Sequence, residues 1–446
     1  MNKKNISGSF LFLLLLSSLL SGCSPYFNQV KFNKPGQQQE KLALIIQENY
    51  PFTSHKNINW DLFSSETYSS LAESRPTKQD YLGVRDLVFR IPDARVNISW
   101  RKDKSLRKLE TAGYLGFDIA YSPVDQFFVC RIDSQSDAWE KGIRVGNGII
   151  GWDRKLISET ISSFPLRWGY HPATPELTKL MACHYLCRGT PGSSVEVFYV
   201  NDQENSKGIR IEYVKKQIEP LPGYVEVIGK ESRKKFEFSR LNDSLGYFRL
   251  DQFTLSGMRF FRKNILPCFD SLSSIIIDLR NNTGGYDPIA VSIASHFVTK
   301  KRYYEESFIK EGSELHTLGV LEAEPDSIQF LGRMIILSGP MTMGVAEGFI
   351  NILEKEDHVK LLGSWNTAGG FSLPGGKIKL GYGIRLYYPV GGSMDTEHNI
   401  IIESGAVGDK GIKPDILIPP TKELIIQMAN GIDVLLMEAV YHIWVE

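Results

Sequence analysis

Residues 274–285 read SIIIDLRNNTGG, and this stretch decides the fold. Apolar runs such as Ile275–Ile277, separated by helical stretches, are typical of β-α-β units whose sheet is covered by helices. The turn that follows ends in Gly284 and Gly285 and opens a helix, so its backbone N–H groups can point at an anion. An ordinary strand-to-helix turn also favours glycines, so the turn alone does not identify a site.

Strand and helix patterns alternate from about residue 245 to the end of the chain. The last stretch, residues 423–445, repeats apolar residues at helical spacing and predicts one terminal amphipathic helix. The sequence therefore predicts an α/β core in this half. The predicted strands are 245–250, 274–279, 334–337 and 359–362, and the helices between them are 258–269, 289–297 and 345–355.

The pattern differs between residues 113 and 215, where short β-type runs are broken by glycine and polar turns. These runs predict a compact β domain, with an inserted loop and helix over 156–192. Upstream, residues 42–110 carry apolar residues at helical spacing and predict a small helical subdomain with an extended exit at 94–100. The β runs are 115–121, 127–132, 148–152, 195–200 and 209–214.

Cys183 and Cys187 stand at i and i+4 on the predicted inserted helix, with His184 between them. A tetrahedral metal site would need a second pair of ligands. Side chains on one helix face are also poorly directed for a disulfide. We therefore expect two buried apolar cysteines, and we expect no metal and no cofactor.

The first residues predict an export signal. Lys3 and Lys4 precede an apolar run at 10–20, which is shorter than the ~20 residues that a helix needs to cross the hydrocarbon core. The run ends in LSGC, which resembles a bacterial lipobox and would make Cys23 the lipidated N-terminus of the mature chain. The alternative is an ordinary signal followed by a chance cysteine. Residues 24–41 are polar and predict a tether.

These features predict a protein of the bacterial cell envelope, lipid-anchored to the membrane and facing the periplasm or the exterior. The 446 residues are 42% hydrophobic and 23% charged, which is ordinary globular composition and enough for two or three domains. Lysine plus arginine number 51 and aspartate plus glutamate number 51, so the chain has no net charge that would attract nucleic acid. We expect no nucleic-acid partner. Five cysteines are too few for a disulfide scaffold.

Two motifs in the β domain, YLGF at 114–117 and SDAWEKGIRVGN at 136–147, resemble those of a PDZ domain. In such a domain the first motif is the carboxylate-binding loop. The N–H groups of Leu115, Gly116 and Phe117 would then hold the C-terminal carboxylate of a peptide, which adds a strand to the sheet edge. The expected partner is a peptide or an unfolded protein C-terminus. The alternative is that the domain serves as an intramolecular lid.

The α/β core contains, in order, LGYFRL at 245–250, IIDLRNNTGG at 276–285, TMGVAE at 342–347, TAGG at 367–370 and GIKPDI at 411–416. With these blocks the chain resembles the C-terminal-processing, or tail-specific, serine peptidase family over about residues 80–420. Members of that family join a PDZ domain to an α/β core related in shape to the crotonase fold. The resemblance therefore implies the fold class α/β, in an α+β multidomain arrangement.

The resemblance also implies a division of the chain. Its parts are 1–22 lipoprotein signal peptide, 23–41 tether, 42–110 N-terminal helical subdomain, 111–218 PDZ-like domain and 219–446 tail-specific-peptidase-like α/β core.

Acyl transfer needs an activated hydroxyl and backbone donors aimed at the developing oxyanion. The resemblance places Gly284 and Gly285 on the oxyanion side, with the N–H of Val345 as the partner donor. Family members read Thr-x-Ser-Ala-x-Glu at the nucleophile, and in this chain Gly344 stands at the serine position.

Both alternative bases of the family are replaced as well. One branch uses a lysine in Thr-Phe-Gly-Lys-Gly, and Gly370 occupies that position here. Another branch uses a histidine before the PDZ domain, where this chain has Arg95, a permanent cation that cannot accept a proton. Thr342, Ser338 and Ser372 are hydroxyls that could replace the serine, but no histidine or lysine stands at a family base position.

The joint loss of nucleophile and bases favours a catalytically degenerate lipoprotein that binds peptides. The alternative from another class is an active serine-type endopeptidase that uses a non-standard residue set. A third hypothesis is a structural or assembly lipoprotein in which both grooves are closed.

Overall fold

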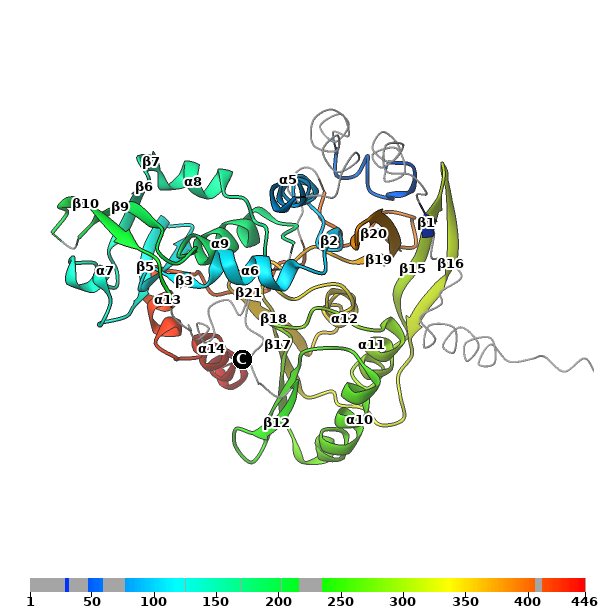
Figure 1. Cartoon of the computed structure of the whole chain (residues 1–446). Helices are drawn as coiled ribbons and strands as arrows, with labels where there is room; N and C mark the ends of the chain where they lie inside the picture. Colours follow the sequence, from blue (N-terminus) through cyan, green and yellow to red (C-terminus); the bar gives the residue numbers. More distant parts are fainter. Residues whose placement is uncertain are drawn as a thin grey trace, which may run out of the picture.

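Figure 1 shows a computed structural model in which a mainly parallel sheet with helices, a set of long antiparallel strands and a smaller β region pack together. The structure describes residues 29–31, 47–58, 77–124, 126–169, 171–201, 203–215, 235–405 and 411–445. The predicted signal segment and Cys23 lie outside the described residues. Within the predicted tether, β1 (Gln29–Lys31) is described and pairs in parallel with Lys377–Lys379.

The central sheet is built from the second half of the chain and has the order β12-β13-β14-β17-β18-β21. Its last five strands are parallel, and β12 is antiparallel to β13. The predicted mixed α/β fold is thereby confirmed. The strands are β12 (Phe236–Arg240), β13 (Leu245–Leu250), β14 (Ser274–Asp278), β17 (Arg333–Leu337), β18 (Val359–Gly363) and β21 (Ile416–Leu417).

The isoleucine run decides how the central sheet is covered, because successive side chains of a strand point to opposite faces. Ile275 and Ile277 pack in a core with helices α10, α11 and α12, whereas Ile276 packs with α14 on the other face. All three side chains are buried. The helices are α10 (Leu255–Asn264), α11 (Asp287–Ala294), α12 (Val345–Leu353) and α14 (Val434–Val445).

The C-terminal segment differs from the single helix predicted over 423–445. It forms α13 (Lys422–Ala429) and α14, with a bend of 111° between them. The break contains Gly431, whose φ of 89° lies in the left-handed region that favours glycine and ends helices. Within the described part of the chain no single helix is long and apolar enough to span a membrane; α13 and α14 taken together are, but as a bent pair.

The predicted helix over 258–269 also divides. Its second part is a 3-10 helix, η2 (Leu266–Ser271), because Pro267 has no N–H to continue the α-helical ladder.

Long antiparallel strands form a second sheet that the sequence did not predict. Its order is β1-β19-β20-β15-β16, and β2 pairs with β20. The strands β19 and β20 follow the central strand β18 in the chain, so the sheet lies beside the ends of the parallel strands (Figure 1). They are β2 (Asn97–Ser99), β15 (Arg302–Glu311), β16 (Glu314–Ala323), β19 (Ser372–Gly381) and β20 (Ile384–Met394).

The smaller β region contains a sheet of order β10-β9-β6-β5-β4, with β7 beside β6, and a three-stranded sheet β11-β3-β8. It packs on the core, since Tyr121 of β4 stacks on Trp365 with ring centroids 6.1 Å apart. Its strands are β3 (Gly113–Tyr114), β4 (Phe117–Ser122), β5 (Gln126–Ile132), β6 (Gly148–Trp152), β7 (Lys155–Leu156), β8 (Arg188–Gly189), β9 (Ser194–Val200), β10 (Ser206–Glu212) and β11 (Val214–Lys215).

The stretch predicted as an inserted loop and helix holds two helices, α8 (Ile157–Ser163) and α9 (Pro175–Leu186). Cys183 lies in α9 and Cys187 caps its end, and both are free and buried, as the sequence predicted. A short helix, α7 (Asp137–Glu140), precedes β6.

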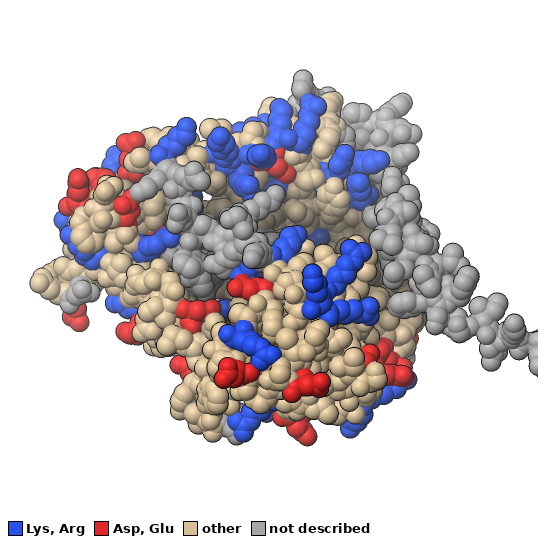
Figure 2. All heavy atoms as spheres, turned by 90° about the horizontal axis from the view of Figure 1, so that it is seen from below, with Lys and Arg blue, Asp and Glu red and all other residues tan. Residues whose placement is uncertain are grey.

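Upstream of this region, α5 (Lys78–Val88) and α6 (Asp103–Thr111) flank β2, which lies within the predicted extended exit. Val84 of α5 shares a hydrophobic core with Ile378 and Leu386 of the antiparallel sheet. The helices therefore pack on the rest of the molecule. The face seen in Figure 2 carries side chains of both charges, in keeping with a chain of zero net charge.

Candidate functional site

The strand-to-helix turn before α12 brings Gly344 to a sharp elbow. Gly344 has φ 63° and ψ −124°, a conformation that L side chains rarely adopt. Sharp, strained turns of this kind between a strand and a helix expose the nucleophile in many hydrolases. The elbow is therefore formed in this chain, but the residue on it has no side chain.

Glu347 fixes the elbow to the loop that follows β18. Its carboxylate is fully buried and accepts hydrogen bonds from Gly344 N (2.9 Å), Thr367 Oγ1 (2.6 Å), Gly369 N (2.7 Å) and Gly370 N (3.0 Å). Burial raises the pKa of Glu347, and the hydrogen bonds oppose that rise. Both oxygens are occupied, so this carboxylate positions two loops.

The predicted oxyanion turn lies directly beside the elbow. Met343 N donates to Asn282 O (2.9 Å), which joins the two turns. Gly284 N donates to Asn282 Oδ1 (2.9 Å), so this N–H is committed to the turn itself. Gly285 and Val345 line a cavity next to the elbow, and Val345 begins α12, where an N–H has no intrahelical acceptor.

Arg95 and Gly370 meet at the same elbow, although they are far apart in the sequence. A Cβ built on Gly344 would overlap Arg95 Nη2, and it would lie 3.5 Å from Gly370 O. A Cβ on Gly284 would lie 3.1 Å from the same Arg95 nitrogen. The guanidinium thus occupies the space into which a side chain at position 344 would project.

Buried polar groups hold the loop that carries Arg95. Asp93 is fully buried, and its carboxylate accepts from Arg95 N (2.7 Å) and from Tyr50 Oη (2.5 Å). Beneath the loop, Lys56 and Glu403 form an ion pair of 2.7 Å in which both side chains are inaccessible to solvent. Sequence reasoning missed Tyr50, Lys56 and Glu403 because they come from segments outside every recognised motif.

The guanidinium of Arg95 has no such support. Its Nε is buried, and it has no hydrogen-bond acceptor among the residues that the structure describes. The loop therefore fixes the backbone of Arg95 and leaves its Nε without an acceptor there.

The alternative hydroxyls are placed very differently. Thr342 Oγ1 donates to Leu279 O (2.8 Å) and accepts from Gly339 N (3.0 Å), so it faces away from the elbow. Ser338 is fully buried at the end of β17 and does not line the cavity. Ser372 does line it, and its Oγ has no hydrogen-bond partner among the described residues.

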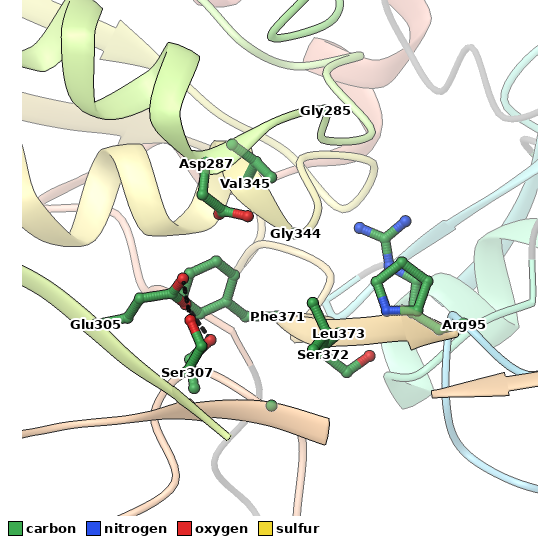
Figure 3. A pocket seen from close by; sticks show the side chains of 13 residues that line it. Arg95, Gly285, Asp287, Glu305, Ser307, Gly344, Val345, Phe371, Ser372 and Leu373 are labelled. Carbon is green, nitrogen blue, oxygen red and sulfur yellow. Dashed lines mark hydrogen bonds between the residues drawn. The ribbon is translucent and has the colours of Figure 1, made fainter. Parts of the chain in front are cut away.

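The cavity beside the elbow has a volume of about 70 Å³, with a guanidinium on one wall and two carboxyl groups on another. Figure 3 shows Arg95 on one side and Asp287 and Glu305 on the other, with Phe371 between them. Tyr304 Oη donates to Asp287 Oδ1 (2.8 Å). No motif in the sequence indicated this acidic wall.

Both acids of the cavity hold their protons more tightly than usual. Glu305 is buried and accepts hydrogen bonds from Ser307 Oγ (2.9 Å) and Ser393 Oγ. Burial, together with the nearby Asp287 charge, raises the pKa of Glu305 to about 8. Burial also raises the pKa of Asp287, against the attraction of Arg95.

The predicted carboxylate loop at Leu115, Gly116 and Phe117 lies in the β region, apart from this cavity. Leu115 N donates to Cys187 O (3.3 Å), so one of the three expected N–H groups is occupied. Gly116 has φ 90°, and a Cβ there would overlap Ser136 Cβ. Phe117 begins β4, the last strand in its sheet order.

Comparisons with known proteins agree with the core. The family described as peptidase family S41 matches residues 244–418. No curated protein matches the chain significantly.

Two solved structures, both of mature CPAF, share the fold at low sequence identity. Mature CPAF complexed with lactacystin has 14% identity and a TM-score of 0.62, with 92% of this chain and 98% of that chain covered. Mature CPAF alone has 14% identity and a TM-score of 0.61, with 89% and 95% covered. The photosystem II D1 C-terminal processing protease has 16% identity and a TM-score of 0.44, with 89% and 97% covered. The family match and the α/β architecture of the core agree. The chain therefore carries a domain of peptidase family S41, which spans residues 244–418.

Proposed function

We propose that this chain is a non-catalytic member of the peptidase family that binds peptides or unfolded C-termini. One observation carries the proposal: the Arg95 guanidinium occupies the space above Gly344 where a nucleophilic side chain would project. A serine mechanism needs a hydroxyl with a base within hydrogen-bond reach. Gly344 has no hydroxyl, and the charged group in the space above it, Arg95, cannot accept a proton.

What remains is a binding site without the attacking atom. The elbow, the adjacent turn and the first N–H of α12 are held in place by Glu347 and Asn282. The cavity beside them stays open to a side chain. With the elbow, the adjacent turn and the cavity present, the site can still bind a peptide although it lacks a nucleophile.

The proposal also covers the β region, which we assign as PDZ-like. The glycine turn at Gly116 leads into β4, which ends its sheet, and α9 lies beside that strand. An edge strand beside a helix is the place where such domains add a peptide strand. All six residues of β4 are buried and Tyr121 stacks on Trp365, which favours the lid alternative for this region.

Anchoring through Cys23 in the bacterial cell envelope is part of the same proposal and rests on the LSGC motif. Cell fractionation of Cys23→Ser tests it. We expect the variant to leave the membrane fraction, and a variant that still pellets after a salt wash would contradict lipid anchoring.

The alternative, an active serine peptidase, is favoured by one feature, the unpartnered Ser372 hydroxyl on the cavity wall. A fluorophosphonate probe separates the two functions, because it labels only activated hydroxyls. We expect no labelling of the native chain and no turnover of a fluorogenic unfolded substrate. Labelling that disappears in Ser372→Ala would overturn the non-catalytic proposal.

A gain-of-function series sharpens the same test. Gly344→Ser alone should remain inactive, because Arg95 stands against the new hydroxyl. Adding Gly370→Lys supplies a base, although a Cβ at Gly370 would lie 3.2 Å from Ala94 Cβ and 3.3 Å from Met343 Cγ, so the loop must adjust. Measurable turnover by the native chain would contradict the proposal.

A further inference from the structure

We propose that the cavity beside the elbow recognises the last residue of a peptide, with the terminal carboxylate on Arg95 and a basic side chain facing Asp287 and Glu305. This inference rests on the proposed peptide-binding function and names the ligand of that site. Four features of the described residues carry it: the buried Arg95 Nε without an acceptor, two further donors on the cavity wall, the acidic wall and the size of the cavity.

The first feature is the guanidinium of Arg95. Its Nε is buried without an acceptor among the described residues, and its Nη2 reaches the glycines of both turns. A buried donor without an acceptor costs roughly 1–3 kcal/mol, and more when it is charged. A carboxylate satisfies a guanidinium with two parallel hydrogen bonds, so a carboxylate is the ligand group that removes this cost most completely.

The second feature is a pair of further hydrogen-bond donors that would stabilise an anion beside Arg95. Val345 opens α12, a helix of nine residues, and its N–H lies on the cavity wall next to Gly344. Ser372 is only 7% exposed and lines the cavity, and its hydroxyl has no partner in the part of the chain that the structure describes. Both groups can donate to an oxygen that Arg95 also holds.

The third feature is the opposite wall. Asp287 and Glu305 face the cavity from α11 and β15, and each is bound by hydroxyls that donate to it. Two neighbouring carboxyl groups in a buried wall favour a cation between them. The ligand is therefore bipolar, with its negative group at Arg95 and its positive group at the acids.

The cavity volume selects among bipolar ligands. A water-sized group needs roughly 10–15 Å³, so a cavity of about 70 Å³ holds about five to seven such groups. A lysine side chain has five non-hydrogen atoms beyond Cα, and an arginine side chain has seven. The cavity thus has room for the side chain of a lysine or arginine, while the rest of the peptide extends away from it.

Calorimetric titration of the full chain with four hexapeptides tests the inference. They share one sequence and end in lysine acid, lysine amide, norleucine acid or norleucine amide. We expect the free acid to bind at least ~10-fold more tightly than the amide, and lysine at least ~10-fold more tightly than norleucine, the scale of one charge-assisted hydrogen bond.

Two variants test which side of the cavity causes the preference for a free carboxylate and which causes the preference for lysine. Arg95→Gln should lose the preference for acid over amide and keep the preference for lysine. The double variant Glu305→Gln with Asp287→Asn should lose the preference for lysine and keep the preference for acid over amide. Matched controls are Arg90→Gln, an exposed arginine of the same segment, and Glu306→Gln, the neighbour of Glu305 on β15, and both should keep both preferences.

The possible failures are distinct. If peptides bind but Arg95→Gln leaves the acid preference intact, the carboxylate is held elsewhere and the inference is wrong while peptide binding stands. If the double acid variant keeps the lysine preference, the acidic wall is not the cation site. If no peptide binds the native chain, the proposed function fails together with the inference.

Discussion

Two charged groups on either side of Gly344 differ in how they are satisfied. Glu347 is fully buried and accepts four hydrogen bonds from the elbow and its neighbouring loop. Arg95 approaches the same glycine from the other side, and its Nε has no acceptor among the described residues. A satisfied buried charge organises a fold, whereas an unsatisfied one is available to a ligand.

Under the proposed function, this difference lets the site lack a nucleophile and still keep its conformation. The elbow and the turn beside it depend on Glu347, Asn282 and backbone hydrogen bonds, none of which involves a nucleophile. Replacing the serine position by glycine therefore leaves the scaffold intact, and it relieves the strain that a side chain would suffer there.

The largest effect should follow removal of the satisfied charge. Glu347→Ala leaves up to four buried donors without an acceptor, and each costs roughly 1–3 kcal/mol. We expect the free energy of unfolding to fall by about 4 kcal/mol or more in urea titration. Glu354→Ala, at the exposed end of the same helix, is the control and should cost less than ~1 kcal/mol. A loss of that small size for Glu347→Ala would refute its organising role.

The next effect concerns the acidic wall and its dependence on pH. The pKa of Glu305 is raised from 4.5 to about 8 in the folded chain. Between these values the unfolded chain releases a proton that the folded chain retains, so stability decreases as pH rises. The slope from one such group is at most ~1.4 kcal/mol per pH unit.

Glu305→Gln mimics the protonated form and should remove this component. We expect the difference in unfolding free energy between native chain and variant to be constant below pH 4.5, to change in favour of the variant up to about pH 8, and to level off above it. Asp287 and Tyr304 remain in both proteins, and because Asp287 and Glu305 influence each other's pKa, the difference reports the loss of Glu305 together with its effect on Asp287. A difference that stays constant from pH 5 to 8 would contradict the raised pKa.

Adding a side chain at the elbow should have an intermediate effect on stability. Gly344→Ala requires an L residue at φ 63° and must displace Arg95. Strain of this kind costs about 1–3 kcal/mol. The double variant Gly344→Ala with Arg95→Ala should recover part of that loss in thermal or urea unfolding. No recovery would show that Arg95 does not occupy the space above Gly344.

The sequence predicted the parallel sheet well and the antiparallel sheet not at all. The apolar run Ile275–Ile277 predicts a strand buried on both faces, and such runs alternate with helices through the core. In β20, by contrast, the adjacent glycines Gly391 and Gly392 form a sequence that is typical of a turn. A Cβ on Gly391 would overlap Phe308 O of β15, so the glycine permits two strands to approach rather than breaking one.

The site was predictable only where motifs cover it. Gly344, Gly370 and Arg95 follow from family positions, and the structure brings them together at the elbow. Asp287 and Glu305 could not be predicted, because they meet through α11 and the antiparallel sheet, which have no family motif in this sequence. When a pocket wall is formed by residues from separate elements, their spacing in the sequence does not indicate that they meet.

The smallest effect is expected where the charge is unsatisfied. Arg95→Gln removes a guanidinium that, among the described residues, has no acceptor at Nε, and the backbone bond from Arg95 N to Asp93 remains. We therefore expect the free energy of unfolding to change by less than ~1 kcal/mol, since the lost packing of the side-chain stem is offset by the removal of a partly buried charge. Arg188→Gln is the matched comparison, because Arg188 pairs with buried Asp118 at 2.5 Å and breaking such a pair costs about 3–5 kcal/mol. Urea titration of both variants decides between the two kinds of arginine. Equal losses would mean that Arg95 already has a partner in the folded chain, and its charge would then not be available to a ligand.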